Sequence, residues 1–230
     1  MENYNGVFMG TVLLQSHNTL GGAKHVFVKL AGSGKDDLLF PTHGGRLMNP
    51  FKGAARIFAG DLLEYRTDEN GENPELYLLK TYLVKSVAGT KVTIVNDKYK
   101  HVPFVGDSLM VAPSTIGGAG TEATVTAVAK DVDGNWEVTL SSALSAAEND
   151  ILVEGDGEGN MLVKAINAVA PCDYDCFYEP SLSDDDWNGA RYFMSPALGG
   201  LMYINRMSPV PACVLALNKC NINGWFKVSL

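Results

Sequence analysis

The feature that most constrains this chain is a Gly-Asp step that leads directly into an apolar run and occurs twice. FAGDLLEY covers residues 58–65, and FVGDSLMVA covers residues 104–112. A weaker third copy, AENDILVE, covers residues 147–154 and has Asn149 in the place of the glycine. Glycine accepts the backbone angles of a corner, and aspartate can hydrogen-bond the turn behind it. Each copy therefore predicts a corner followed by a strand that enters a core.

Strand signals are dense in this sequence, and helix signals are sparse. Runs rich in Val, Thr, Ile, Tyr and Leu end at clusters of Gly, Asn or Asp, as β-strands do. Apolar residues nowhere keep the rhythm of an amphipathic helix over three turns, although residues 141–150 could form a turn or two. The sequence predicts strands at residues 7–14, 25–30, 76–87, 91–96, 123–132 and 136–142.

Two tight turns complete a repeated unit. Ala88-Gly89 lies between two predicted strands, and Asp133-Gly134 is a dipeptide that accepts the positive φ angles of a type I′ hairpin turn. The glycine of the Gly-Asp step precedes the glycine of the turn by 29 residues in the first unit and by 28 in the second. These spacings predict a duplicated unit with a period near 45 residues. The predicted structural turn residues are Gly60, Asp61, Gly89, Gly106, Asp107, Asp133 and Gly134.

The predicted fold class is mainly β, with tandem small β-barrel or β-sheet units that begin at Gly-Asp steps. Each unit has three or four short strands, enough for a small barrel or for a partial sheet that closes on its neighbour. Long irregular arms and few helices complete the expectation. We divide the chain into an N-terminal β domain at residues 1–100 with an arm at 31–56, a second Gly-Asp unit at 101–169, and a C-terminal region at 170–230. The C-terminal region holds all four cysteines and either completes the core or serves docking or oligomerisation.

Composition and charge narrow the classes of partner. Of the 230 residues, 46% are hydrophobic and 19% are charged, which is typical of a globular chain with a core of its own. The net charge of -8 and the scattering of 18 basic residues argue against nucleic acid as a partner. No apolar run is long enough for a transmembrane helix, and the first residues lack the basic start of a signal peptide. We expect no membrane partner and synthesis in a cytoplasm.

Motifs that would carry catalysis are weak in this sequence. GSGKDD at residues 32–37 lacks the first glycine and the final hydroxyl of a Walker phosphate loop. SDDDWNG at residues 183–189 lacks the alternating spacing of a calcium loop, and the four histidines are scattered. No Gly-x-Ser-x-Gly elbow is present. The sequence therefore predicts no catalytic residue, no metal and no cofactor, and we expect a protein that is not an enzyme.

The cysteines leave two further readings open. Cys172 with Cys176, and Cys213 with Cys220, are spaced C-x3-C and C-x6-C, which is unusual for structural zinc. Partly buried free thiols are the expectation, with a disulfide possible in an oxidising environment. An enzyme that uses Cys172 or Cys176 is a third functional class, and it would require a reactive thiol.

Residues 104–157 carry a resemblance to a known family. The matching elements are Gly106-Asp107, the loop PSTIGGAGTEA, the strand TVTAV, the turn Asp133-Gly134, and Asp150 followed by Ile-Leu. This segment resembles the recurring Gly-Asp module of head-fibre and auxiliary capsid (decoration) proteins of tailed bacteriophages, especially crAss-like and other Bacteroidales phages. The resemblance implies an oligomeric virion protein bound outside the capsid shell, without a cofactor.

The leading functional hypothesis is therefore a structural virion protein, a head fibre or capsid decoration subunit. Its expected partners are further copies of itself, as a dimer or trimer, and the major capsid protein, and its expected location is the virion after assembly in the host cytoplasm. The alternative is a carbohydrate-binding β module, for which Trp136, Trp187 and Trp225 are candidates, although Trp136 alternates with core residues in its strand. The candidate interface residues are Arg46, Phe51, Trp187 and Tyr192, since aromatic residues and arginine are enriched at interface centres.

Overall fold

The computed structural model describes residues 44–49, 55–70, 73–96, 101–176, 193–197, 200–203, 207–217, 221–222 and 226–229. Over these ranges the fold is mainly β, as the sequence predicts, with one short helix, α4 (Ala212–Leu215). No helix within these ranges has the length and hydropathy needed to cross a membrane. The predicted strands at residues 7–14 and 25–30 lie outside the described residues.

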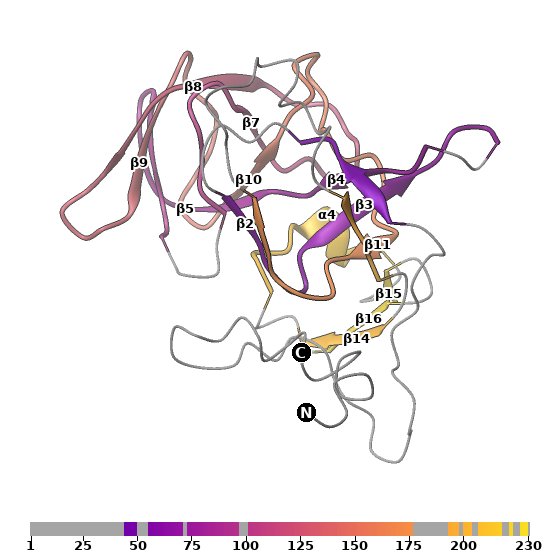
Figure 1. Cartoon of the computed structure of the whole chain (residues 1–230). Coiled ribbons are helices and arrows are strands. Elements are labelled where there is room, and N and C mark those ends of the chain that lie inside the picture. The colour runs from indigo at the N-terminus through magenta and orange to yellow at the C-terminus, as the bar shows by residue number, and fades with distance from the viewer. Residues whose placement is uncertain are drawn as a thin grey trace, which may run out of the picture.

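A closed barrel of six strands is the largest sheet (Figure 1). Its strands follow one another around the wall in the order β10, β5, β6, β9, β8 and β7, and every neighbouring pair is antiparallel. Closure pairs every strand on both sides, so the barrel has no open edge. The strands are β5 (Thr81–Ala88), β6 (Lys91–Ile94), β7 (Ser108–Val111), β8 (Glu122–Lys130), β9 (Trp136–Leu140) and β10 (Ile151–Glu154).

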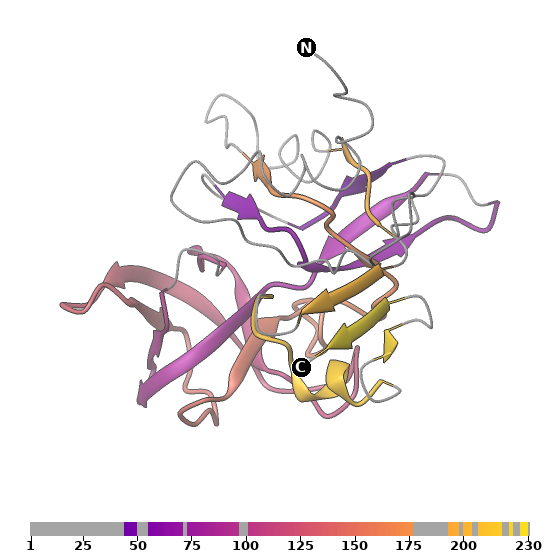
Figure 2. The same ribbon diagram turned by 90° about the horizontal axis from the view of Figure 1, so that it is seen from below.

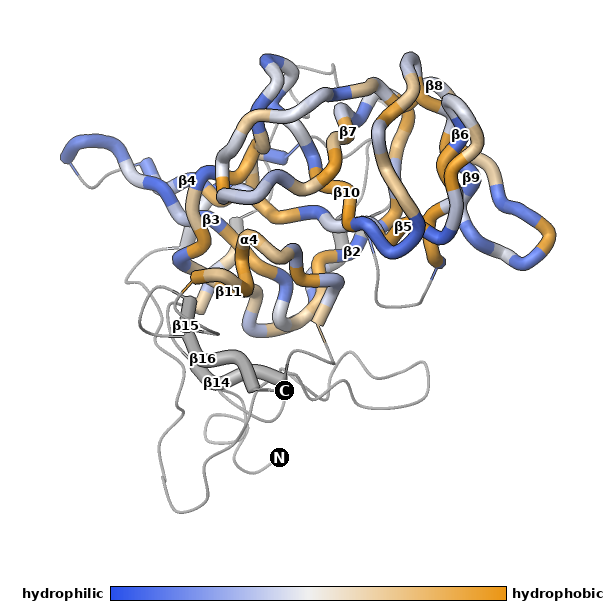
Figure 3. The backbone as a smooth tube through the Cα atoms, turned by 180° about the vertical axis from the view of Figure 1, so that it is seen from behind, coloured by the Kyte–Doolittle hydropathy of each residue, from blue (hydrophilic) through white to orange (hydrophobic). Residues whose placement is uncertain are grey.

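Alternating side chains fill the barrel interior. In β9, Val138 and Leu140 are buried while the residue between them is only partly buried, and β6 buries Val92 and Ile94 in the same way. Figure 3 shows hydrophobic colour along the barrel strands and hydrophilic colour at most loops. Full burial of such a side chain contributes about 1.5–3 kcal/mol relative to exposure. The barrel core consists of Tyr82, Val84, Val92, Ile94, Leu109, Ala123, Val125, Val138, Leu140, Leu144 and Leu152.

A five-stranded mixed sheet lies beside the barrel (Figure 2). Its strand order is β11, β3, β4, β1 and β13, with β1 parallel to β4 and the other pairs antiparallel. The strands are β1 (Gly45–Leu47), β3 (Leu62–Arg66), β4 (Glu75–Leu78), β11 (Ala168–Val169) and β13 (Phe193–Met194).

Two smaller sheets complete the described strands. Strand β2 (Ala55–Ile57) pairs with β12 (Tyr174–Cys176), and β16 (Phe226–Ser229) lies between β14 (Gly200–Tyr203) and β15 (Asn221–Ile222). The β2–β12 pairing places the chain before β3 next to the chain after β11.

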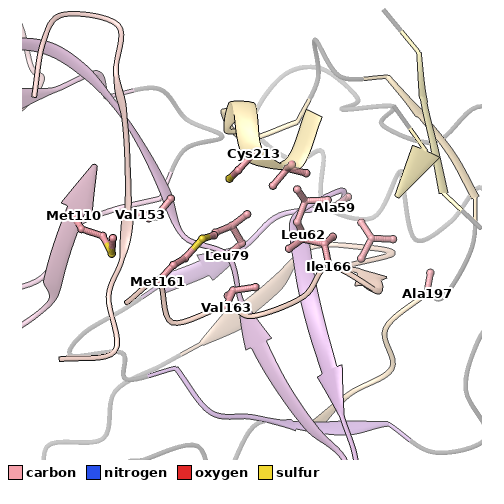
Figure 4. Packing of buried hydrophobic residues seen from close by; sticks show 12 residues of the cluster. Ala59, Leu62, Leu79, Met110, Val153, Met161, Val163, Ile166, Ala197 and Cys213 are labelled. Carbon is pink, nitrogen blue, oxygen red and sulfur yellow. The ribbon is translucent and has the colours of Figure 1, made fainter. Parts of the chain in front are cut away.

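A shared hydrophobic cluster joins the barrel, the five-stranded sheet and α4 (Figure 4). Met110 and Val153 come from the barrel, Leu62 comes from β3, and Cys213 and Val214 come from α4. Buried apolar surface shared in this way makes the two sheets parts of one core. The complete cluster is Ala59, Leu62, Leu79, Met110, Val153, Met161, Val163, Ile166, Val169, Ala197, Cys213 and Val214.

The arrangement of the two Gly-Asp units differs from the prediction. The expected strand at residues 76–87 is two strands, because the chain leaves the five-stranded sheet after β4 and enters the barrel at β5. Strands β3 and β4 of the first unit therefore lie in one sheet, while β5 and β6 pair with β10 and β9 of the second unit. The domain boundary drawn between residues 100 and 101 thus runs through a single barrel.

The arm expected at residues 31–56 contains a strand of the five-stranded sheet. Strand β1 lies between β4 and β13, and its Leu47 is 1% exposed. The expectation of a long irregular excursion is wrong for residues 44–49, since β4 provides hydrogen-bond partners that local composition does not reveal. Of the two roles left open for residues 170–230, completion of the core is the one that Met194, Cys213 and Val214 perform.

Candidate functional site

Both Gly-Asp steps form the same corner. The backbone N–H of Asp61 donates to the carbonyl of Phe58 (2.9 Å), and the Asp61 carboxylate accepts the N–H of Phe58 (2.7 Å). Asp107 makes the same two bonds with Phe104, at 3.1 and 3.0 Å. The aspartate therefore closes the turn twice, once with its backbone and once with its side chain.

The third copy reproduces this corner without a glycine. Asp150 makes both bonds with Ala147, at 3.1 and 2.7 Å. Asn149 has a φ of 70°, against 86° for Gly60 and 97° for Gly106. A turn whose third residue has a positive φ favours glycine and next asparagine, which explains the substitution.

The first corner aspartate lies at the centre of a buried hydrogen-bond group. Asp61 is 1% exposed and accepts bonds from the hydroxyl of Ser208 and from Nε2 of His101 (2.9 Å). The other ring nitrogen of His101, Nδ1, accepts the backbone N–H of Thr81 (3.0 Å). Because a backbone N–H can only donate, Nδ1 carries no proton, and the neutral imidazole holds its proton on Nε2 toward Asp61.

The second corner aspartate belongs to a buried ionic group. The ammonium of Lys80 lies 3.0 Å from Glu154 Oε1 and 3.8 Å from Asp107 Oδ1. The amide of Asn49 donates to Glu154 Oε2 (2.8 Å), and the Tyr82 hydroxyl approaches Asp107 Oδ2 (3.5 Å). All five side chains are at most 5% exposed.

Burial governs the ionisation of this group. Burial raises the pKa of Glu154 above its usual value, Lys80 opposes the rise, and the charge of Asp107 adds to it. Burial, with the charges of Asp107 and Glu154, also holds the pKa of Tyr82 well above its usual value. Two carboxyl groups share one ammonium, so Lys80 only partly offsets the effect of burial on the pKa of Glu154.

Together the two groups form a polar joint between the barrel and the five-stranded sheet. Lys80 and Thr81 stand where the chain passes from β4 to β5, Asp61 precedes β3, and Asp107 and Glu154 belong to the barrel side. The side chains of this joint are at most 7% exposed. Within the described residues, one buried polar side-chain atom, Thr81 Oγ1, makes no hydrogen bond. The polar joint consists of Asn49, Asp61, Lys80, Thr81, Tyr82, His101, Asp107, Glu154 and Ser208.

An apolar pocket of about 540 Å³ opens on the surface of the barrel. One wall is the segment before β7, and the other is formed by β8 and β9. The indole N–H of Trp136 donates to Asn96 Oδ1 (3.1 Å), and the ammonium of Lys130 lies 4.7 Å from the centre of its ring. These contacts orient the Trp136 ring at the pocket. The pocket is lined by Val102, Pro103, Phe104, Val105, Val128 and Trp136.

The two predicted hairpin turns differ in detail from the prediction. Ala88 pairs with Lys91 and ends β5, so the turn is Gly89-Thr90, with a φ of 64° at Gly89. This is the position that glycine takes in a type II′ turn.

The turn at Asp133-Gly134 is not type I′. Gly134 has a φ of 82°, but Asp133 does not have the positive φ that type I′ requires at both positions. The hairpin end is instead a five-residue loop in which Asp131 Oδ1 accepts the N–H groups of Asp133 (2.9 Å) and Asn135 (2.8 Å).

The structure places one of the four candidate interface residues. Arg46 on β1 is partly exposed, lies 4.0 Å from Glu75 and borders a small polar pocket of about 260 Å³. Phe51, Trp187 and Tyr192 lie outside the described residues, as does Trp225.

Burial acts on both cysteines whose side chains the structure describes, Cys172 of the C-x3-C pair and Cys213 of the C-x6-C pair. Cys172 and Cys213 are buried free thiols, and burial raises the pKa of each above its usual value. A raised pKa lowers the fraction of the nucleophilic thiolate at neutral pH. The side chain of Cys176 and the whole of Cys220 lie outside the described parts of the chain.

Among the members of the polar joint, Asp61 and Asp107 are the two that the sequence predicts as structural residues. Lys80 is a single lysine within the apolar run LYLLKTYLV, and this is the one available signal in the sequence of a buried ion pair. His101, Glu154 and Asn49 carry no local signal, because their partners are distant in the chain.

Within the described residues, no group of three or more His, Cys, Asp or Glu side chains is arranged to hold a metal ion.

Comparisons of the chain with protein-family models, with curated proteins and with solved structures found no match.

Proposed function

We propose that this chain is a structural virion protein, a head fibre or decoration subunit attached to the outside of a phage capsid. It acts by docking rather than by catalysis, and its partners are further copies of itself and the major capsid protein. The proposal places it in the virion after assembly in the host cytoplasm. The resemblance of residues 104–157 supports it, and strands β7 to β10 lie in this segment.

The observation that carries the proposal is a difference in accessibility. The polar joint is buried, whereas the apolar pocket is open at the surface. The ionisable residues of the polar joint are buried and engaged with one another, as structural groups are. The accessible hollow on the barrel is lined by apolar side chains, of which Phe104, Val105, Val128 and Trp136 belong to the resembling segment. An open apolar hollow on a stable barrel suits the side chains of a protein partner.

Detection of the chain on phage particles tests this function. Phage particles that carry the gene for this chain would be purified by density gradient. Mass spectrometry would identify their proteins, and immunogold labelling with antibodies against the purified chain would locate it on the particle. We expect the chain in a fixed ratio to the major capsid protein, with gold on the outside of intact heads. Absence of the chain from purified virions would overturn the proposal.

Of the three candidate tryptophans of the carbohydrate-binding alternative, Trp136 is the one within the described residues, and its ring borders the pocket. A sugar site combines an aromatic face with several polar groups, whereas the described residues that line this pocket are apolar. We therefore expect no hit on a glycan array. A clear hit that Trp136→Ala abolishes and Trp187→Ala retains would assign glycan binding to this pocket and favour the alternative.

A further inference from the structure

Within the described residues, Lys80 is the lysine whose ion pairs are buried on both sides. Its side chain is 1% exposed, and those of its partners Asp107 and Glu154 are 4% and 5% exposed. In the other lysine ion pairs of the described residues, the lysine side chain is at least 42% exposed. The polar joint therefore holds an amine and two carboxyl groups together in the interior of the protein.

We propose that Lys80 and Asp107 join after folding in an intramolecular amide (isopeptide) bond, with Glu154 as the catalytic proton carrier. The ion pairs of the polar joint are the arrangement from which this bond forms. It forms once in each chain, so the reaction is a modification of the chain and not the turnover of a substrate. The inference goes beyond the proposed function and does not depend on it, because the reacting groups lie within one chain.

The barrel strands bring the three side chains into contact. Strand β10 pairs with β5 on one side and with β7 on the other, and its last residue is Glu154. Lys80 and Asp107 come directly before β5 and β7. The Lys80 Nζ lies 3.0 Å from Glu154 Oε1 and 3.8 Å from Asp107 Oδ1. Groups held together in this way react at a far higher effective concentration than the same groups free in water.

Glu154 is placed to take the proton that blocks the amine. An ammonium cannot attack a carbon, because its lone pair is bound to a proton. Transfer of that proton to Glu154 converts the buried ion pair into a neutral amine and a neutral acid, which burial penalises less than two charges. Burial raises the pKa of Glu154 above its usual value, although Lys80 opposes the rise, and a raised pKa makes the carboxylate a better proton acceptor.

The two oxygens of Asp107 have different surroundings. Oδ2 accepts the backbone N–H of Phe104 (3.0 Å), and the Tyr82 hydroxyl approaches the same oxygen (3.5 Å). These donors stabilise the negative charge that develops on Oδ2 when the amine adds to Cγ. Oδ1 is the oxygen nearer to Lys80, and it is the one that leaves.

The reaction is a condensation that releases one water molecule. The lone pair of Lys80 Nζ forms the bond to Cγ of Asp107, and the electron pair of the Cγ–Oδ1 bond leaves with Oδ1. Of the three hydrogens on the ammonium, one stays on the amide nitrogen, and two are carried by Glu154 to Oδ1 and leave as water. Glu154 is a carboxylate before and after the reaction, and no further reactant is required.

Apolar packing protects the product from hydrolysis. Leu79 and Val153, the chain neighbours of Lys80 and Glu154, lie in the shared hydrophobic cluster (Figure 4). A site that excludes water slows the reverse reaction, in which water attacks the amide.

Asn49 is the competing electrophile. Its amide donates to Oε2 of Glu154 (2.8 Å), and reaction of Lys80 with it would release ammonia instead of water. The Asn49 side chain is bound through both its oxygen and its nitrogen to the backbone of Leu78. Asn49 thus acts as a positioning residue for Glu154, while the ammonium of Lys80 approaches Asp107.

Mass spectrometry of the full-length chain, denatured and reduced, tests the bond. We expect a mass that is one water below the mass of the sequence. Because trypsin does not cleave after an amidated lysine, we expect a branched peptide in which residues 67–85 are joined to residues 101–130. A wild type at its full sequence mass would overturn the inference. Loss of water without this branch, or a branch from Lys80 to Asn49 with loss of ammonia, would overturn it as well.

Two variants test the individual steps. Glu154→Gln keeps the size of the side chain but cannot take a proton, so we expect its full sequence mass. In Asp107→Asn the amide oxygen accepts the Phe104 N–H and the amide nitrogen faces Lys80. Its reaction releases ammonia and gives the same linked chain, so its mass should coincide with that of the linked wild type.

The control is Lys85→Arg, which alters an exposed lysine of β5 and should still lose one water. Circular dichroism would verify that each variant is folded. A folded Glu154→Gln chain that loses water, or a folded Asp107→Asn chain that keeps its full mass, would contradict the proposed chemistry. Virion labelling is independent of these masses, so failure of the bond and failure of the capsid role are distinguishable.

Discussion

At the residue scale, aspartate performs two tasks in each Gly-Asp corner. Its carboxylate first closes the corner by accepting the N–H three residues before it. In the first two copies the same carboxylate also meets a side chain from another element, His101 for Asp61 and Lys80 for Asp107. Asp150 is half-buried at most, and its corner is the more exposed version of the same turn.

The backbone requirement of the corner can be measured at Gly106. Gly106 is exposed and has a φ of 97°, so substitution tests conformation without removing buried contacts. We expect Gly106→Ala to lower the free energy of unfolding by about 1–2 kcal/mol, because a Cβ disfavours the left-handed region. We expect Gly106→Asn to cost less, in line with Asn149 in the third copy. Urea denaturation would measure both.

The matched control lies at the third corner. Asn149 is exposed with a φ of 70°, so Asn149→Gly should change stability little, and Asn149→Ala should repeat the loss seen at Gly106. Equal stability of Gly106→Ala and the wild type would show that the corner does not require a positive φ.

At the scale of elements, two loops share a sequence pattern and a structure. Residues 131–135 read DVDGN and residues 156–160 read DGEGN. The first aspartate of each loop accepts the N–H groups of the third and fifth residues, at 2.9 and 2.8 Å in one and at 2.9 and 3.0 Å in the other. The pattern Asp-x-acid-Gly-Asn is therefore a structural motif of this chain.

The second of these loops predicts a dependence on pH. Although partial burial acts to raise it, bonds from Lys164 and from the N–H groups of Glu158 and Asn160 hold the pKa of Asp156 well below its usual value of 3.8. A lowered pKa stabilises the fold above pH 3.8, and this contribution is lost as the pH falls toward the folded pKa. We expect Asp156→Asn to lose about 0.5–1 kcal/mol at neutral pH, chiefly through the Lys164 pair, and to differ less from the wild type in acid.

Thermal unfolding of both proteins from pH 7 to pH 2 would measure this difference. Glu158→Gln is the control, since it removes one negative charge from the same loop while the Glu158 backbone N–H still donates to Asp156. A difference between Asp156→Asn and the wild type that is constant with pH would contradict the assignment.

At the scale of the whole molecule, the polar joint connects two sheets that share one hydrophobic core. Lys80 lies where the chain crosses from one sheet to the other, and its partners Asp107 and Glu154 lie at the barrel. Breaking a buried ion pair by removing one partner leaves an uncompensated charge. We expect Lys80→Met to lower the free energy of unfolding by about 3–5 kcal/mol.

A double-mutant cycle tests that explanation. Because the pKa of Glu154 is raised, Glu154→Gln resembles the protonated form and should cost less than Lys80→Met. In the double variant we expect a favourable coupling of about 1–3 kcal/mol. Lys85→Met removes an exposed lysine from β5, the strand that follows Lys80, and should have a small effect. Strict additivity of Lys80→Met and Glu154→Gln would contradict the ionic joint.

Local features of this protein could be predicted from its sequence because their interactions span few residues. The Gly-Asp corners close over three residues, and the alternation of Val138 and Leu140 in β9 follows from the pleat of a strand. These features identified a mainly β fold, the strand starts and most of the barrel strands. The prediction of a type I′ turn at Asp133-Gly134 is wrong, because the side chain of Asp131 caps a five-residue loop there.

The tertiary structure alone decided which strands pair and what surrounds each corner. The crossing at Lys80 from one sheet to the other depends on β10 and β9 as pairing partners for β5 and β6. Asp61 meets Ser208, which is 147 residues away in the chain, whereas Asp107 meets Lys80 and Tyr82. The same local corner thus acquires a neutral setting in one copy and an ionic setting in the other, because long-range partners are selected by burial and strand closure and not by neighbouring residues.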